Sequence, residues 1–185
     1  FLSIYNMSKN IKKSILQYSY LEIEKEEIEE KCAGVEEEMR KAMKKHHPDA
    51  FKEMYNKNNK KTENPTTVEE SEKKQKTPDI KKIYRKIVSK IHPDKSIGNE
   101  KTFKEAAEAY KTNNIAKLLE IAYRCNLEIT SLSYESLTLL ANNIIQVQKK
   151  IQSLKETTAW AWIQTKTEEE KIAVLDNIVK YIKEK

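Results

Sequence analysis

The chain has 185 residues, of which 35% are charged and 38% hydrophobic, and its formal net charge is +6 at pH 7. This balance supports small helical cores and excludes one large globular core. With only 2 glycines and 4 prolines, the composition argues against β-sandwiches and glycine-rich phosphate loops, and it predicts an all-α fold with long helices. Every apolar run is shorter than the roughly 18 residues that span a membrane.

The two cysteines, Cys32 and Cys125, lie far apart and form no CxxC pair. We therefore expect a reducing, cytoplasmic compartment, with neither a metal site nor another cofactor. The first residues, FLSIYNMSKN, lack the basic stretch and apolar core of a signal peptide. The abundance of lysine, asparagine and isoleucine is typical of AT-rich genomes, viral genomes among them.

The first expected domain, residues 1–55, is predicted to consist mainly of a long helix over 8–46. Apolar residues recur along it at helical spacing, beginning with Ile11 and Ile15. The part from 22 to 38 holds nine glutamates and two lysines. Such a segment is either a solvated helix face or a face that lies against a basic helix, in this chain or in a partner.

A polar stretch over 56–76 contains almost no apolar residues, so we expect a disordered linker there. The next domain, 77–126, opens with a helix start signal, because Thr77 can act as N-cap and Pro78 as the first helical residue. One apolar stripe then follows the helix, formed by Ile80, Ile83, Tyr84, Ile87, Val88 and Ile91.

Two more helices are expected within this domain. After a loop at 96–99, a helix over 101–111 carries small residues such as Ala106, which would allow close packing against the preceding helix. A polar stretch at 112–114 separates this helix from the next and can cap it, and a short helix follows over 115–125.

The last expected domain, residues 127–185, has two apolar seams with the 3-4 spacing of coiled coils. The first seam consists of Leu137, Leu140, Ile144, Val147, Ile151 and Leu154. The second follows a capping box of Thr167 and Glu170 and consists of Ile172, Leu175, Val179 and Ile182. We expect these helices to form an antiparallel, coiled-coil-like hairpin. Trp160 and Trp162 would pack at its end; exposed, they would mark a surface for a client or scaffold protein.

The tripeptide His92-Pro93-Asp94 follows the first helix of the 77–126 domain. Proline ends the helix and fixes the backbone, so the ring of His92 and the carboxylate of Asp94 are expected at an exposed tip between two antiparallel helices. A carboxylate displayed in this way can accept charge-assisted hydrogen bonds from an arginine of a partner. The preceding helix would steer an acidic partner through its basic residues, Lys81, Lys82, Arg85, Lys86 and Lys90.

Known catalytic motifs are missing from the sequence. It contains no HEXXH, GxSxG, Walker A or CxxC motif, and its three histidines form no metal-ligand cluster. No nucleophile stands at an informative spacing from His92 and Asp94. We therefore expect a binding protein rather than an enzyme.

The stretch IKKIYRKIVSKIHPDK, followed after a short loop by FKEAAEAY, resembles the J domain of DnaJ-type co-chaperones over about residues 79–111. In that family a basic helix leads to His-Pro-Asp and a second helix packs back on the first. The resemblance implies contact with a DnaK-type chaperone and stimulation of its ATPase. The partner-binding residues that it implies are His92, Pro93, Asp94, Lys95, Tyr84, Arg85, Lys86 and Lys90. The core positions that it implies are Ile83, Ile87, Phe103, Ala107 and Tyr110.

The chain departs from the family pattern in two ways. The family's first helix, with its Tyr and Leu-Gly signature, has no counterpart directly before residue 80, so we expect the 8–46 helix or the 115–125 helix to cover the core instead. No glycine- and phenylalanine-rich segment, zinc-binding cysteine array or recognisable substrate-binding domain follows.

A second His-Pro-Asp occurs upstream, at His47, Pro48 and Asp49. Pro48 should end or kink the long helix. AFKEMY follows directly, without the loop that would let a second helix fold back. Chance and a lysine-rich composition explain this copy better than a decayed duplication, so we assign it no role.

Three function classes compete. The first is a J-domain co-chaperone, and the second is a helical interaction or scaffold protein whose degenerate J-like fold has no chaperone coupling. A nucleic-acid binder, suggested by the pI of about 9.0, is disfavoured because no aromatic-interleaved basic patch occurs and the 22–38 segment is acidic. An exposed basic helix favours the first class, and burial of that helix against the glutamates favours the second.

Overall fold

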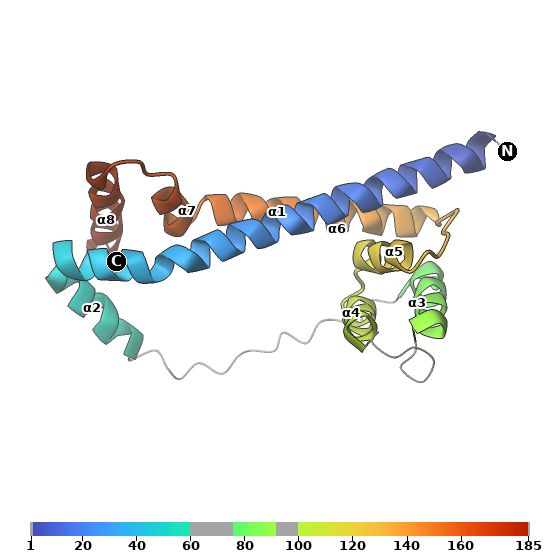
Figure 1. The fold of residues 1–185 in the computed structure, drawn as a ribbon, viewed down its shortest axis with the longest axis horizontal. Coiled ribbons are helices and arrows are strands. Elements are labelled where there is room, and N and C mark those ends of the chain that lie inside the picture. Colours follow the sequence, from blue (N-terminus) through green and yellow to red (C-terminus); the bar gives the residue numbers. More distant parts are fainter. Residues whose placement is uncertain (1, 60–75, 92–99, 185) are drawn as a thin grey trace. The chain divides into compact units, whose positions relative to one another are not determined.

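The computed structural model describes residues 2–59, 76–91 and 100–184, and every regular element in them is an α-helix (Figure 1). This confirms the predicted all-α fold and its long N-terminal helix. The helices are α1 (Leu2–His46), α2 (Pro48–Asn59), α3 (Pro78–Ile91), α4 (Glu100–Lys111), α5 (Ile115–Arg124), α6 (Tyr134–Lys155), α7 (Thr158–Ile163) and α8 (Glu168–Lys183). In the described part of the chain, no helix combines the length and the apolar character that crossing a membrane requires.

The chain forms two compact units, each built from segments that are far apart in the sequence. The first unit comprises residues 1–24 and 71–149, and it contains the beginning of α1, the helices α3 to α5 and most of α6. The second unit comprises residues 25–70 and 150–185, and it contains the rest of α1, the end of α6, and the helices α2, α7 and α8.

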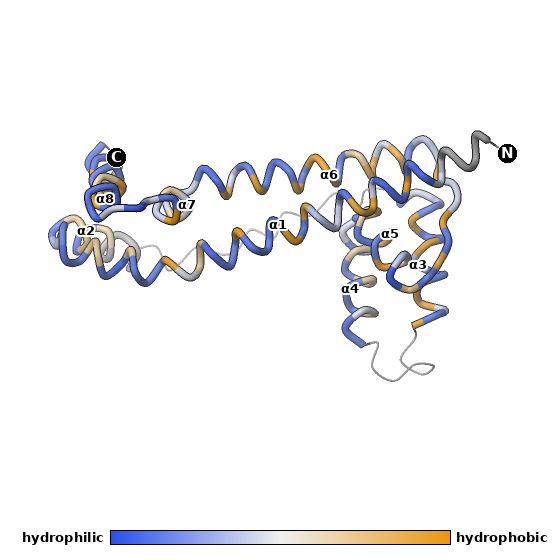
Figure 2. Tube along the Cα trace, turned by 45° about the horizontal axis from the view of Figure 1, so that its top comes forward, coloured by the Kyte–Doolittle hydropathy of each residue, from blue (hydrophilic) through white to orange (hydrophobic). Residues whose placement is uncertain are grey.

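The core of the first unit lies between α3, α4 and α5, which pack against one another pairwise. The α3 and α4 helices lie side by side, and the ends that flank residues 92–99 point the same way, so the two helices are antiparallel (Figures 1 and 2). Six of the ten residues of α5 are buried. The sequence left open whether the 8–46 or the 115–125 helix covers the α3–α4 pair, and α5 contacts both of its helices.

The N-terminus of α5 also holds the beginning of α1 and the middle of α6. Asn114 caps α5 by accepting a hydrogen bond from the backbone N–H of Lys117 at 2.9 Å. Its side-chain amide donates to the hydroxyl of Tyr18 at 3.1 Å. Burial raises the pKa of Tyr18, so this hydroxyl stays protonated. On the α6 side, Asn143 accepts from the backbone N–H of Ala116 at 3.3 Å. Three helices are thereby tied together at one point.

The second unit has its own core around Leu175, which is 1% exposed. Leu175 of α8 packs with Met43 of α1 and Trp162 of α7, and the capping box predicted for Thr167 and Glu170 is present at the start of α8. The apolar residues around this cluster, all partly buried, are Val35, Met39, Ala42, Phe51, Val174, Ile178, Val179 and Ile182.

These contacts show what surrounds α8, and the predicted C-terminal hairpin stays a prediction. Among the described residues, the cluster around Leu175 draws on α1, α2, α7 and α8 and includes none of the residues of the α6 seam. The buried residues of that seam are Leu140, Ile144, Val147 and Ile151. The 3-4 spacing correctly indicated that both helices bury an apolar face, and the face of α8 packs with residues of α1, α2 and α7. Trp162 is buried in the chain, as expected.

Candidate partner-binding site

The α3 helix is fixed at its N-terminus by a buried threonine. Thr77 is 4% exposed, and its hydroxyl accepts a hydrogen bond from the backbone N–H of Ile80 at 3.3 Å, as predicted for an N-cap. The same hydroxyl lies 3.1 Å from the hydroxyl of Ser136 on α6. From this start the helix buries one stripe, which consists of Ile80, Ile83, Ile87 and Ile91.

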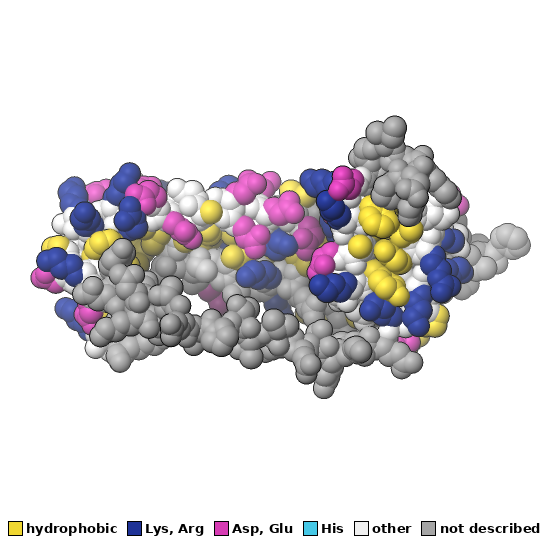
Figure 3. Space-filling model, turned by 90° about the horizontal axis from the view of Figure 1, so that it is seen from below, with side chains coloured by type: hydrophobic (Ala, Val, Ile, Leu, Met, Phe, Trp, Pro, Cys, Tyr) yellow, Lys and Arg dark blue, Asp and Glu magenta, His cyan; other side chains and the backbone are white. Residues whose placement is uncertain are grey.

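The opposite side of α3 is basic and faces solvent. Arg85, Lys86 and Lys90 are all exposed there, because they lie away from the isoleucine stripe at helical spacing. Figure 3 shows lysine and arginine side chains gathered over the region of α3. These three predicted site residues therefore share one surface, and we call it the basic face.

Tyr84 differs from the other predicted site residues on α3 because it is half-buried. Its ring stacks on that of Tyr110 of α4, with centroids 4.3 Å apart and an interplanar angle of 18°. The ammonium group of Lys76 lies 4.8 Å from the centroid of the Tyr110 ring, within reach of a cation–π interaction. In the described structure Tyr84 thus helps to hold α3 against α4, and only part of it is available to a partner.

The irregular segment between α5 and α6 lies beside the basic face. Asn126, Leu127 and Glu128 line a shallow hollow of about 500 Å³ together with residues of α3, namely Arg85, Lys86, Ser89 and Lys90. Glu128 is exposed and brings a negative charge to this surface. No local pattern in the sequence signals this neighbour, because the residues that line the hollow are about 40 positions apart in the chain.

This irregular segment is anchored at its far end by Asp79, in the first turn of α3. The carboxylate accepts a hydrogen bond from the backbone N–H of Ser133 at 2.8 Å. Burial opposes ionisation of Asp79, but hydrogen bonds from Ser133 and Ser136 outweigh it, so the pKa of this carboxyl is lowered. Asp79 and Lys82 also line a second hollow of about 270 Å³ with residues 128–133. Asp79 therefore helps to fix the position of the segment between α5 and α6, which borders the basic face.

The predicted tripeptide, His92, Pro93 and Asp94, and the following Lys95 lie outside the described residues. The two helices on either side of them are described: α3 ends at Ile91 and α4 begins at Glu100. The basic face therefore leads directly to the position of the tripeptide in the chain.

The upstream His-Pro-Asp forms a corner between α1 and α2. Pro48 is the first residue of α2, and the side chain of Asp49 is 97% exposed, with its carboxylate 3.8 Å from the ammonium group of Lys52. The Nε2 atom of His47 lies 3.1 Å from a carboxylate oxygen of Asp176 on α8. The histidine thus faces a neighbouring helix of its own unit, while the aspartate points to solvent.

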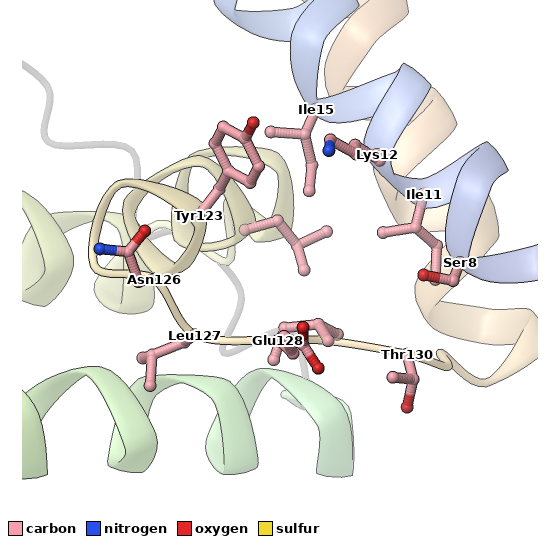
Figure 4. Close-up of a pocket in the computed structure, with 11 residues that line it drawn as sticks. Ser8, Ile11, Lys12, Ile15, Tyr123, Asn126, Leu127, Glu128 and Thr130 are labelled. Carbon is pink, nitrogen blue, oxygen red and sulfur yellow. The ribbon is translucent and has the colours of Figure 1, made fainter.

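Another open groove in the first unit, of about 370 Å³, lies between the beginning of α1, the end of α5 and the 126–130 segment. Figure 4 shows Ile11 and Ile15 on its α1 side and Tyr123 on its α5 side. The ammonium group of Lys12 lies 5.6 Å from the centroid of the Tyr123 ring. Across the described ranges of the chain, no three histidine, cysteine or acidic side chains are placed to hold a metal ion.

Comparison with known proteins assigns the region around the basic face to a family. Residues 68–112 match the DnaJ domain. The chain is also 54% identical over 43 residues to the chaperone protein DnaJ of Treponema denticola. This match covers 22% of the chain and 11% of that protein, so the chain spans only a small part of its relative's length. No solved structure matches the chain. Residues 68–112, which include α3, the position of His92-Pro93-Asp94 and α4, are a DnaJ domain.

Proposed function

We propose that the protein is a J-domain co-chaperone that stimulates ATP hydrolysis by a DnaK-type chaperone through His92, Pro93 and Asp94. The observation that carries the proposal is the match to the DnaJ domain over 68–112, which includes the tripeptide. The exposure of Arg85 and Lys86 on the helix that leads to it adds support. The carboxylate of Asp94 accepts hydrogen bonds from an arginine of the chaperone, and such charge-assisted bonds are stronger than neutral ones.

The basic face supplies the second part of the mechanism. A cluster of like charges beside a binding loop raises the rate of encounter with an acidic surface, and salt weakens this effect. Arg85, Lys86 and Lys90 are exposed and would guide the chaperone to the loop. Glu128 borders the same hollow, so it would disfavour an approach by acidic groups from that side.

The test compares the two His-Pro-Asp copies in one chain. Single-turnover ATP hydrolysis by a DnaK-type chaperone is measured with the wild type, Asp94→Asn and Asp49→Asn. Asp94→Asn should abolish stimulation, because the amide no longer carries the charge that strengthens the bond. Asp49→Asn is the matched control and should stimulate like the wild type, since its side chain is 97% exposed at a helix corner. Circular dichroism checks that both variants are folded.

Three results would contradict the proposal. Equal stimulation by the wild type and Asp94→Asn would exclude the mechanism, and loss of stimulation in Asp49→Asn alone would transfer it to the upstream copy. Absence of any stimulation by the wild type would favour the other candidate, a helical scaffold without chaperone coupling. Burial of the basic face against the 22–38 glutamates would have favoured that candidate, whereas Arg85 and Lys86 are exposed.

The role of the basic face is tested separately with Arg85→Ala. The variant should need a higher concentration than the wild type to reach the same stimulation at low salt, and the difference should shrink as salt is added, because screening removes long-range attraction. Lys149→Ala, which removes an exposed lysine of α6 outside the basic residues of α3, serves as the control. An Arg85→Ala defect that is independent of salt would show a direct contact rather than steering.

A further inference from the structure

The early part of α1 carries an exposed apolar stripe that the proposed function does not use. Leu16, Tyr20 and Ile23 are 52%, 67% and 57% exposed. They are spaced by four and then three residues, so they lie on one face of the helix. The buried side of the same stretch is formed by Ile11, Ile15, Tyr18 and Leu21. The helix thus has a covered face, which packs in its own chain, and a second apolar face that meets solvent.

Charged residues continue the exposed stripe at both ends. Lys13 precedes Leu16 by three residues, and Glu27 follows Ile23 by four, so both lie on the line of the stripe along the continuous helix α1. Both are exposed, and the carboxylate of Glu27 lies 4.0 Å from the ammonium group of Lys31 on the same helix. From its N-terminal end, the stripe therefore consists of one positive residue, three apolar residues and one negative residue.

We propose that this stripe binds the same stripe of a second copy of the chain, with the two helices antiparallel. A two-fold axis through Tyr20 places Lys13 of one copy opposite Glu27 of the other at both ends, and it brings Leu16 of one copy within one residue of the position opposite Ile23 of the other. Each charge then meets its opposite, and the apolar residues meet one another. In a parallel pair, lysine would face lysine and glutamate would face glutamate, which is destabilising.

The contact is short, with three apolar positions per copy, so the dimer should be weak and reversible. Sedimentation velocity of the full chain should show a monomer that dimerises as the concentration rises through the micromolar range. Tyr20→Lys places two like charges across the axis, and the dimer should be lost. Ile145→Lys introduces the same charge at another exposed apolar residue, 45% exposed on α6 and off the stripe, and this matched control should dimerise like the wild type.

Charge reversal tests both the partner and the orientation. Lys13→Glu alone and Glu27→Lys alone should each remain monomeric, because each places like charges opposite each other at both ends of an antiparallel pair. An equimolar mixture of the two variants should dimerise again, because every facing pair is then opposite in sign. The double variant, Lys13→Glu with Glu27→Lys, should also dimerise. Circular dichroism confirms that each variant keeps its helices.

Four results would overturn the proposal. A wild type that stays monomeric throughout the concentration range would exclude the second copy as the occupant of the stripe. A dimer that survives Tyr20→Lys, or one that Ile145→Lys also abolishes, would place the contact elsewhere. Single charge reversals that dimerise like the wild type would exclude the antiparallel arrangement, since a parallel pair keeps its like-charge contacts in those variants.

Discussion

Asp79 shows how a single side chain connects the DnaJ-domain region with a distant part of the chain. It stands in the first turn of α3, where a negative charge interacts favourably with the helix dipole, and it accepts the hydrogen bond of the Ser133 backbone N–H at 2.8 Å. The hydroxyls of Ser133 and Ser136 lie 3.0 Å apart, and Ser136 is fully buried. One carboxylate therefore fixes both the start of α3 and the chain that enters α6.

Removing this carboxylate should destabilise the protein in a pH-dependent way. Asp79→Ala should lower the free energy of unfolding by about 1 kcal/mol at pH 7, since it removes a charge-assisted hydrogen bond on a partly exposed group. The pKa of Asp79 is lowered in the folded protein, so its contribution is present above the unfolded pKa, about 4, and is lost as the pH falls through the folded pKa. Urea unfolding of both proteins at several pH values should therefore give curves that converge in acid. A constant difference down to pH 2 would show that the ionised form has no special role.

At the scale of the elements, the sequence predicted the helices better than their partners. Thr77 and the capping box of Thr167 and Glu170 mark helix starts by local chemistry, and the structure has both. Apolar spacing predicts which face of a helix is buried, but it does not identify what covers that face. Leu175 is buried, as its place in the seam predicts, and it packs with Met43 and Trp162, which the spacing alone does not identify. The approach of Glu128 to the basic face could not be predicted either, because it depends on how the chain returns after α5.

The partners of α8 can be tested by a double-mutant cycle. Leu175→Ala and Met43→Ala remove two buried side chains of one cluster, and each should cost about 2–5 kcal/mol. Because the two side chains belong to one cluster, the two substitutions would enlarge the same space. Their effects on the free energy of unfolding should therefore not add, and the coupling energy should be about 0.5–3 kcal/mol. Leu175→Ala combined with Ile144→Ala serves as the control and should be additive. Coupling with Ile144 instead of Met43 would support direct packing of α8 on α6, as the sequence predicts.

At the scale of the whole molecule, two compact units share two helices, since α1 and α6 each contribute residues to both. Each unit has a buried apolar core of its own. Ile87, fully buried, belongs to the core of the first unit, and Leu175 belongs to that of the second. The DnaJ domain, over 68–112, contributes α3 and α4 to the first core, so the function proposed for it depends on that core and not on the second.

The chain provides a probe that reports on one unit alone, because both of its tryptophans, Trp160 and Trp162, lie in the second unit. Because each unit has a buried core of its own, we expect the two units to unfold in separate transitions. Leu175→Ala should therefore lower the denaturant midpoint of the tryptophan fluorescence, whereas Ile87→Ala should leave that midpoint unchanged and lower part of the helical circular dichroism transition. Each substitution should cost its own unit about 2–5 kcal/mol. Stimulation of the chaperone ATPase should depend on the first unit alone. The Ile87→Ala variant should therefore lose stimulation at denaturant concentrations at which the Leu175→Ala variant still stimulates. A shift of the tryptophan midpoint by Ile87→Ala would instead show that α1 and α6 transmit stability from one unit to the other.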